Sequence, residues 1–174
     1  ILPDGSLQLI CGSANGILDH ISCGDVVTFT GSASTGKKLK AHSKLIDEAI
    51  PFNMEADSLN ASILGSDSIP GTTEFDLFIK EIQKEMTVKA GQKCTAIRRI
   101  IVPENMVEDV QEALCKRLSK TIVGNPAVEG VRMGPLAGDP QVVEVSEKVN
   151  KLLESQNIIY GDLENFDVVG ADKN

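Results

Sequence analysis

Apolar positions along the chain follow two periods, which together predict alternating strands and helices. Short apolar or β-branched runs that end near glycine or proline predict strands over residues 7–11, 25–30, 52–55, 59–64, 98–102, 121–124 and 158–160. Apolar residues at helical spacing predict helices over residues 34–50, 73–89, 105–118 and 142–153. This alternation predicts an α/β protein with mostly parallel strand pairing.

The composition is that of a folded protein and excludes several classes of partner. The chain has 174 residues, of which 41% are apolar and 24% charged. A net charge of −8 and an aromatic content of 3% argue against nucleic acid, because an acidic surface repels phosphates. No apolar run approaches the ~18 residues that a membrane span needs, so no membrane partner is expected. The first residues lack both a basic segment and a methionine, so we expect a piece of a longer chain without a secretory signal.

The spacing of the cysteines argues against metal or disulfide chemistry. The chain has four of them, at Cys11, Cys23, Cys94 and Cys115. They lie too far apart for a zinc ribbon or a C-x-x-C redox motif, so we expect reduced thiols in a cytoplasmic protein and no metal site. Cys11 and Cys115 lie in apolar segments and are expected in the core. His20 and His42 have polar neighbours and are expected on the surface.

A glycine-rich turn at residues 31–38 follows a predicted strand and opens a predicted helix. It nearly fits the phosphate loop G-x-x-x-x-G-K-[ST], but Lys38 replaces the hydroxyl that would hold magnesium. A helix N-terminus at the end of a parallel strand still offers N–H groups to an anion such as a dinucleotide pyrophosphate. A tight strand-to-helix turn without a ligand is the alternative.

Two residues are candidates for catalysis. Cys94 lies among four basic residues, Lys89, Lys93, Arg98 and Arg99. Positive neighbours raise the thiolate fraction of a cysteine, which favours a nucleophile over the alternative of a buried thiol near surface charges. Glu55 follows an apolar run at residues 50–54, where a partly enclosed carboxylate could serve as a general base rather than a solvated side chain.

Several segments taken together resemble the aldehyde dehydrogenase superfamily over roughly residues 1 to 160. Residues 2–12 look like the lead into a late strand of the family's cofactor domain, and residues 29–36 match its F-T-G-S-x-x-x-G turn. Residues 91–94 match its G-Q-x-C segment. Residues 123–126 and 133–136 match the V-G-x-P…M-G-P-[LQ] stretch that follows. Their order along the chain is that of the family.

The resemblance implies a fold and a role for each candidate residue. It implies the C-terminal part of a Rossmann-type NAD(P)-binding domain over residues 1–57 and a partial α/β catalytic domain over residues 58–174. Cys94 would be the nucleophile and its backbone N–H half of the oxyanion hole, and Glu55 would be the general base. Ser32 would contact the pyrophosphate of NADP or NAD within the turn that Gly31 and Gly36 shape.

One departure from the family pattern implies a branch. The family's L-E-L-G-G-K is M-E-A-D-S-L-N here, at residues 54–60. With residues 86–99, this resembles the aldehyde dehydrogenase domain of bacterial phenylacetate-degradation proteins, which often carry a MaoC-like hydratase domain. The resemblance implies oxidation of an aldehyde, in that branch a CoA-linked semialdehyde, to a carboxylate through a thiohemiacetal and a thioester, by a homo-oligomer.

Three further expectations follow from the same resemblance. The chain by itself should bind dinucleotide weakly and should not turn over, because much of the family's length is missing from it. A CoA-acylating dehydrogenase, in which CoA rather than water takes the acyl group, is an alternative. A non-catalytic module for oligomer assembly or acyl-CoA docking is the other, and in it Cys94 would be an ordinary thiol.

Overall fold

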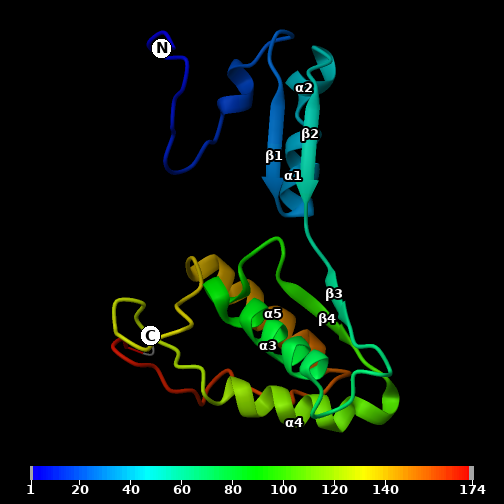
Figure 1. Ribbon diagram of the computed structural model, residues 1–174. Helices are drawn as coiled ribbons and strands as arrows, with labels where there is room; N and C mark the ends of the chain where they lie inside the picture. Colours follow the sequence, from blue (N-terminus) through cyan, green and yellow to red (C-terminus); the bar gives the residue numbers. More distant parts are fainter. Residues whose placement is uncertain (1, 173–174) are drawn as a thin grey trace. The chain divides into compact units, whose positions relative to one another are not determined.

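The computed structural model describes residues 2–172 and divides the chain into two compact units, Ile1–Asp57 and Ser58–Asn174 (Figure 1). Each unit contains one two-stranded parallel sheet, so the predicted α/β class with parallel pairing is confirmed. The assignment of the units to cofactor binding and to catalysis stays a prediction.

The first unit is one strand–helix–strand arrangement preceded by an irregular segment. Its elements are η1 (Ile17–His20), β1 (Val27–Gly31), α1 (Ala33–Lys40), α2 (Ser43–Asp47) and β2 (Phe52–Ala56). The two strands pair from Val27 opposite Phe52 to Gly31 opposite Ala56. A single helix over residues 34–50 was expected, but the chain leaves helical geometry at His42 (φ −65°, ψ 133°) and forms two helices. His42 is half-buried rather than on the surface, and its Nε2 lies 3.3 Å from Asp19 Oδ1.

The second unit packs two helices against a short sheet. Its elements are β3 (Asn60–Ile63), α3 (Thr73–Thr87), η2 (Val88–Gly91), β4 (Ile97–Ile101), η3 (Glu104–Met106), α4 (Val107–Leu118) and α5 (Asp139–Leu153). The core of this unit joins α3, α4 and the loops beside them through buried residues Leu64, Phe75, Ile79, Met106 and Val110. The apolar stripe of α3 explains its packing, because Phe75, Ile79 and Ile82 recur at helical spacing and are all buried.

Two strands predicted from apolar runs are wrong. Residues 7–11 and 158–160 form no strand, and Leu7 is 89% exposed. An apolar run becomes a strand only where another strand supplies its hydrogen bonds, and the described residues supply no partner to either run. Cys11 was expected in the core and is exposed, whereas Cys115 is half-buried.

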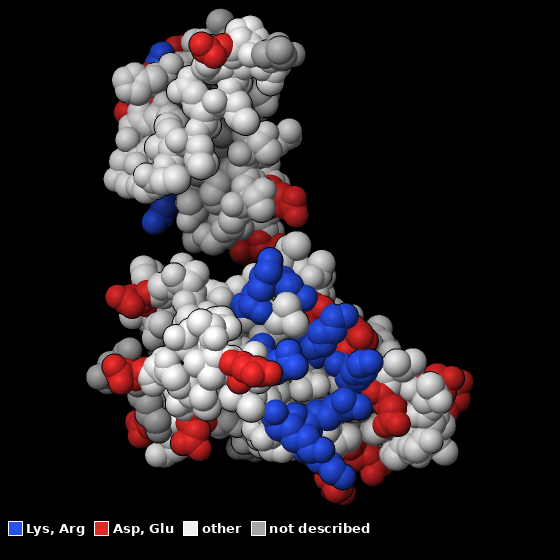
Figure 2. Space-filling view, turned by 60° about the vertical axis from the view of Figure 1, so that its left-hand side comes forward, with Lys and Arg blue, Asp and Glu red and all other residues white. Residues whose placement is uncertain are grey.

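Charge is unevenly distributed although the chain as a whole is acidic. Figure 2 shows Lys and Arg side chains gathered on one face of the second unit. A groove of the second unit is lined by the basic residues Lys116, Arg117 and Lys120, together with Asp76, Gln83 and Ala113. No helix within residues 2–172 is both long and apolar enough to cross a membrane.

Candidate active site

Cys94 lies on an exposed loop between η2 and β4 in the second unit. The loop is entered through three consecutive left-handed residues, Lys89 (φ 53°), Ala90 (φ 52°) and Gly91 (φ 70°). Glycine adopts this conformation freely, whereas each of the other two costs about 1–2 kcal/mol. The surrounding contacts must therefore offset this strain.

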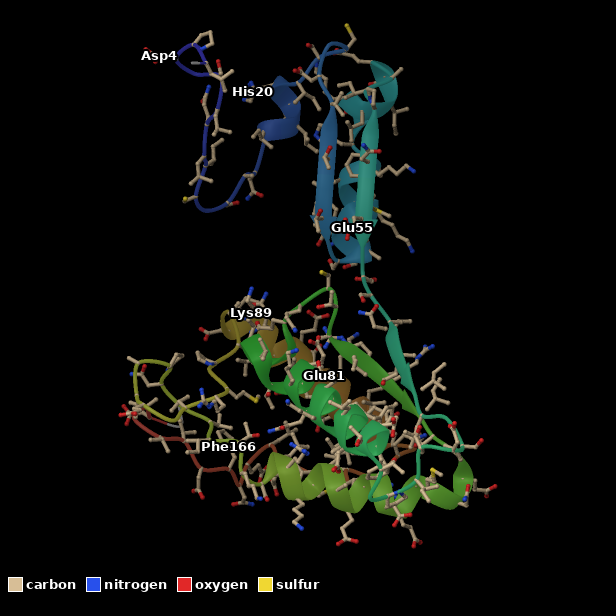
Figure 3. All side chains as sticks on the ribbon, viewed as in Figure 1. Asp4, His20, Glu55, Glu81, Lys89 and Phe166 are labelled. Atoms are coloured by element: carbon tan, nitrogen blue, oxygen red, sulfur yellow. The ribbon has the colours of Figure 1, made fainter. Side chains whose placement is uncertain are left out.

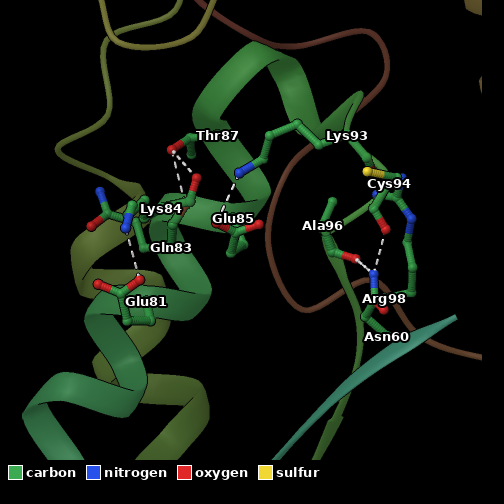
Figure 4. Close-up of polar contacts among 10 residues, drawn as sticks. All are labelled: Asn60, Glu81, Gln83, Lys84, Glu85, Thr87, Lys93, Cys94, Ala96 and Arg98. Carbon is green, nitrogen blue, oxygen red and sulfur yellow. Dashed lines mark hydrogen bonds and ion pairs between the residues drawn. The ribbon is translucent and has the colours of Figure 1, made fainter. Parts of the chain in front are cut away.

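The backbone on both sides of the Cys94 α-carbon is held by hydrogen bonds (Figure 4). The carbonyl oxygen of Cys94 accepts from Ser58 Oγ and from Asn60 Nδ2, each at 2.6 Å. The carbonyl oxygen of Lys93, which belongs to the same peptide as the Cys94 N–H, accepts from the Ala96 N–H at 3.2 Å and from a guanidinium nitrogen of Arg98 at 3.4 Å. The thiol itself stays exposed, as a nucleophile requires.

Gln92 connects the cysteine loop to a distant segment of the second unit. Its Nε2 donates to the carbonyls of Lys89 (2.9 Å) and Pro135 (3.4 Å), and its Oε1 accepts from the Ala137 N–H at 2.8 Å. The G-Q-x-C and M-G-P-L segments, which were recognised separately in the sequence, therefore lie together. The V-G-N-P segment joins them through a bridge between Val123 and Met133.

Two of the four basic residues around Cys94, Lys93 and Arg98, have partners of their own. Lys93 Nζ lies 2.8 Å from Glu85 Oε1, and both side chains are largely buried. Farther along α3, the carboxylate of Glu81 accepts a hydrogen bond from Lys84 at 3.0 Å and raises the pKa of Lys84 above its ordinary value. The charge cluster that suggested a nucleophile therefore acts in part as structural support for the loop.

The glycine-rich turn of the first unit is built as the sequence predicted. Ser32 caps α1, and its Oγ accepts from the Thr35 N–H at 3.2 Å. Gly36 is buried against the strands, and a Cβ there would lie 2.3 Å from Met54 Sδ, so a larger residue would require the Met54 side chain to move. Gly31 ends β1 and directly precedes the cap.

Glu55 lies on β2 opposite Thr30, one pair before Gly31 opposite Ala56 (Figure 3). The carboxyl ends of the two parallel strands thus bring Glu55 beside the turn that contains Ser32. Its side chain is exposed, so the partial enclosure expected from the preceding apolar run is absent within the first unit.

The residues of the turn suit a phosphate-bearing cofactor. The exposed hydroxyls of Ser32, Ser34 and Thr35 cluster there, with Ser32 Oγ 3.1 Å from Ser34 Oγ and 2.9 Å from Thr35 Oγ1. The Ala33 N–H at the positive end of α1 already donates to Asp57 Oδ1 at 3.1 Å, which shows that this position attracts an anionic oxygen. Within residues 2–172, no three His, Cys, Asp or Glu side chains gather as metal ligands.

Sequence reasoning missed the residues that hold the cysteine loop. Ser58 and Asn60 attracted no attention because small polar residues in a loop or short strand have no distinctive spacing. Gln92 was noted only as part of a motif. Of the predicted site residues, Gly31, Ser32, Gly36 and Glu55 lie together in the first unit, and Cys94 lies in the second.

Comparisons with known proteins agree on one family. The sequence profile described as "Aldehyde dehydrogenase family" matches residues 1–168. The 3,4-dehydroadipyl-CoA semialdehyde dehydrogenase of Aromatoleum evansii is 45% identical over 172 residues, which is 99% of this chain and 33% of that protein. This chain thus spans about a third of the length of that curated relative.

Solved structures show the same likeness. A double mutant of Staphylococcus aureus betaine aldehyde dehydrogenase, in complex with NAD+, matches with a TM-score of 0.70 and 25% identity over 79% of this chain and 26% of that one. Aldehyde dehydrogenase C of Pseudomonas syringae shares the fold, with a TM-score of 0.66 and 22% identity over 79% of this chain and 27% of that one. Because the family profile matches residues 1–168, the chain belongs to the aldehyde dehydrogenase family.

Proposed function

We propose that this chain is one part of a longer enzyme that oxidises an aldehyde to a carboxylate with a nicotinamide cofactor, and that Cys94 is its nucleophile. The observation that carries the proposal is the exposed Cys94 thiol on a loop whose flanking peptides are both hydrogen-bonded to the rest of the unit. Membership of the aldehyde dehydrogenase family supports the reaction class.

The residues of the chain would act in the following way. The thiolate of Cys94 attacks the aldehyde carbon, a C–S bond forms, and the carbonyl oxygen takes the negative charge. The backbone N–H of Cys94 donates to that oxygen. When bound, the nicotinamide supplies the acceptor for the hydride of the former aldehyde carbon, which leaves a thioester on Cys94. Glu55 takes a proton from the water that attacks the thioester, the C–S bond breaks, and the carboxylate departs.

The cofactor would be held in part by the turn at the start of α1. Ser32 would contact its pyrophosphate, within the turn that Gly31 and Gly36 shape by leaving room for the side chains of Phe29 and Met54. The carboxylate of Asp57 occupies one N–H of this turn and would have to release it to a phosphate oxygen. The choice between NADP and NAD is tested by comparing kcat/KM for the two cofactors in the longer enzyme.

The substrate that we propose is a CoA-linked semialdehyde, as expected for the phenylacetate-degradation branch. The 45% identity to a 3,4-dehydroadipyl-CoA semialdehyde dehydrogenase supports this substrate class. A comparison of kcat/KM for a CoA-linked semialdehyde and for the same semialdehyde without CoA tests it. Equal values would contradict the proposed substrate while leaving the aldehyde oxidation intact.

Cys94→Ala tests the role of the nucleophile. The longer enzyme carrying this change should lose aldehyde oxidation, whereas Cys23→Ala, which removes another exposed thiol, should keep it. Iodoacetamide labelling over a pH series, with the four cysteines mapped by mass spectrometry, should find Cys94 reacting faster than Cys23. Full activity in Cys94→Ala would contradict the proposal and favour a non-catalytic module that serves oligomer assembly or acyl-CoA docking.

Glu55→Gln separates hydrolysis from acyl transfer to CoA. The variant should form the acyl-enzyme and fail to release carboxylate, because no base activates the attacking water. Glu129→Gln changes another exposed glutamate and is the matched control. If Glu55→Gln instead turns over normally when CoA is added, the enzyme is a CoA-acylating dehydrogenase. The 174-residue chain alone should show no turnover in the same assay.

A further inference from the structure

We propose that Asn60 is a positioning residue for Cys94 and that Ser58 assists it, an inference that rests on the proposed role of Cys94 as nucleophile. Asn60 Nδ2 donates to the Cys94 carbonyl at 2.6 Å and lies 3.3 Å from the carbonyl oxygen of Ala96. Ser58 Oγ donates to the same Cys94 carbonyl at 2.6 Å and lies 2.7 Å from Asn60 Nδ2. One carboxamide therefore bridges two carbonyls of the cysteine loop (Figure 4).

The pairing of β3 with β4 explains why Asn60 faces this loop. Asn60 pairs with Ile97, but the next residue, Ala61, pairs with Arg99, so β4 has one extra residue at Arg98. Such a bulge changes the direction in which the neighbouring side chains point. Here Asn60 Nδ2 donates to the carbonyl oxygen of Cys94, while the guanidinium of Arg98 donates to the carbonyl oxygen of Lys93. One residue of each strand thus holds one of the two peptides that flank the Cys94 α-carbon.

These contacts restrain the peptide that follows Cys94. A carbonyl oxygen has two lone pairs, and those of Cys94 are matched by two donors, Ser58 and Asn60. Rotation of this peptide would break both hydrogen bonds. Because the preceding peptide is held through the Lys93 carbonyl, the side-chain torsion is the main freedom left to the thiol. Hydrogen bonds to the Lys93 carbonyl also strengthen the Cys94 N–H as a donor, because linked hydrogen bonds polarise one another.

The carboxamide is suited to this task because it donates and carries no charge. An aspartate has the same shape but presents only acceptors to the carbonyls of Cys94 and Ala96, so it would repel them. A negative charge beside the loop also disfavours a thiolate. Asn60→Asp therefore changes the positioning function without changing side-chain volume.

The first experiment measures steady-state kinetics in the longer enzyme. Asn60→Asp should lower kcat by about 10- to 100-fold and leave KM for the aldehyde nearly unchanged, because a misplaced nucleophile slows chemistry rather than binding. Asn105→Asp, an exposed asparagine of the same unit, is the matched control and should keep kcat. Equal kcat in the two variants would overturn the proposal.

Substitution of Ser58 is a second test, which applies even if the Asn60→Asp variant fails to fold. Ser58→Ala removes a single oxygen atom and should leave the fold intact. Ser58→Ala should lower kcat by about 3- to 10-fold, and Ser58→Thr, which keeps the hydroxyl, should restore it. Ser66→Ala, at an exposed serine of the same unit, should have no effect. If Ser58→Thr is as slow as Ser58→Ala, the hydroxyl does not act through its hydrogen bond and the proposal is wrong.

Alkylation of the thiol distinguishes failure of this inference from failure of the proposed function. In the 174-residue chain, Asn60→Asp should slow iodoacetamide labelling of Cys94 and leave the labelling of Cys23 unchanged. If Cys94→Ala keeps full activity, the proposed function fails, whatever the labelling shows. If Cys94→Ala is inactive and Asn60→Asp changes neither kcat nor labelling, only the positioning role fails.

Discussion

The two turns that contain the candidate site are held in different ways. Around Ser32, the hydrogen bonds join residues within four positions of one another, apart from two contacts with Asp57, whose Oδ1 accepts from the Ala33 N–H and whose N–H donates to the Gly31 carbonyl. Around Cys94, the bonds come from Ser58, from Asn60 and from the segment at residues 135–137. The first turn is therefore a local structure, whereas the cysteine loop takes its conformation only when the second unit has folded.

This difference has a functional consequence. An anion-binding turn needs N–H groups and hydroxyls, which a strand–helix junction provides by itself. A nucleophile must be held within a fraction of an ångström of the productive position, and contacts from several parts of a fold provide that precision. The comparison leads to three predictions, in order of decreasing effect.

Ile79→Ala should cause the largest loss of stability, and this loss should be confined to the second unit, which contains the cysteine loop. Ile79 is 1% exposed in the core of that unit, and truncation of such a side chain costs about 2–5 kcal/mol of unfolding free energy. Hydrogen exchange should show faster exchange at the Ala96 N–H, while amides of β1 in the first unit keep their protection.

Leu77→Ala on the same helix is the control, because Leu77 is 51% exposed and its loss should change stability by less than about 0.5 kcal/mol. If Ile79→Ala destabilises β1 as much as it destabilises the second unit, the two units unfold together. The two turns would then not differ in stability.

Gln92→Ala should have an intermediate effect. It removes the contacts to the carbonyls of Lys89 and Pro135 and to the Ala137 N–H. Because Gln92 is exposed, the net loss should be about 1–2 kcal/mol, measured by denaturant unfolding. Gln156→Ala, at another exposed glutamine of this unit, should be neutral. If the two variants are equally stable, the loop does not depend on the segment at residues 135–137.

Ser32→Ala should have the smallest effect and should stay within the first unit. Loss of an N-terminal cap costs about 0.5–2 kcal/mol, typically about 1. Exchange should speed up at the Thr35 N–H, which the Ser32 hydroxyl holds, and labelling of Cys94 should not change. Ser32→Asp keeps an acceptor at the cap and should restore protection. A changed labelling rate at Cys94 would show that this turn is not local in its effects.

The sequence alone predicted several features that neighbours in the chain decide. The spacing of Phe75, Ile79 and Ile82 identified the buried face of α3, because a helix sets its own period. The strand–turn–helix order around residues 31–36 was also predicted from the local pattern, although the division of the following helix at His42 was not. Cys94 was singled out from its short motif and its basic neighbours.

Tertiary structure alone decided which segments meet. Residues 7–11 have the composition of a strand but remain irregular, because strand formation depends on a partner elsewhere in the chain. Asn60 contacts the Cys94 carbonyl only because β3 pairs with β4 around an extra residue at Arg98, and no local pattern encodes that pairing. A candidate nucleophile could therefore be proposed from the sequence, but the residues that contact its backbone could not.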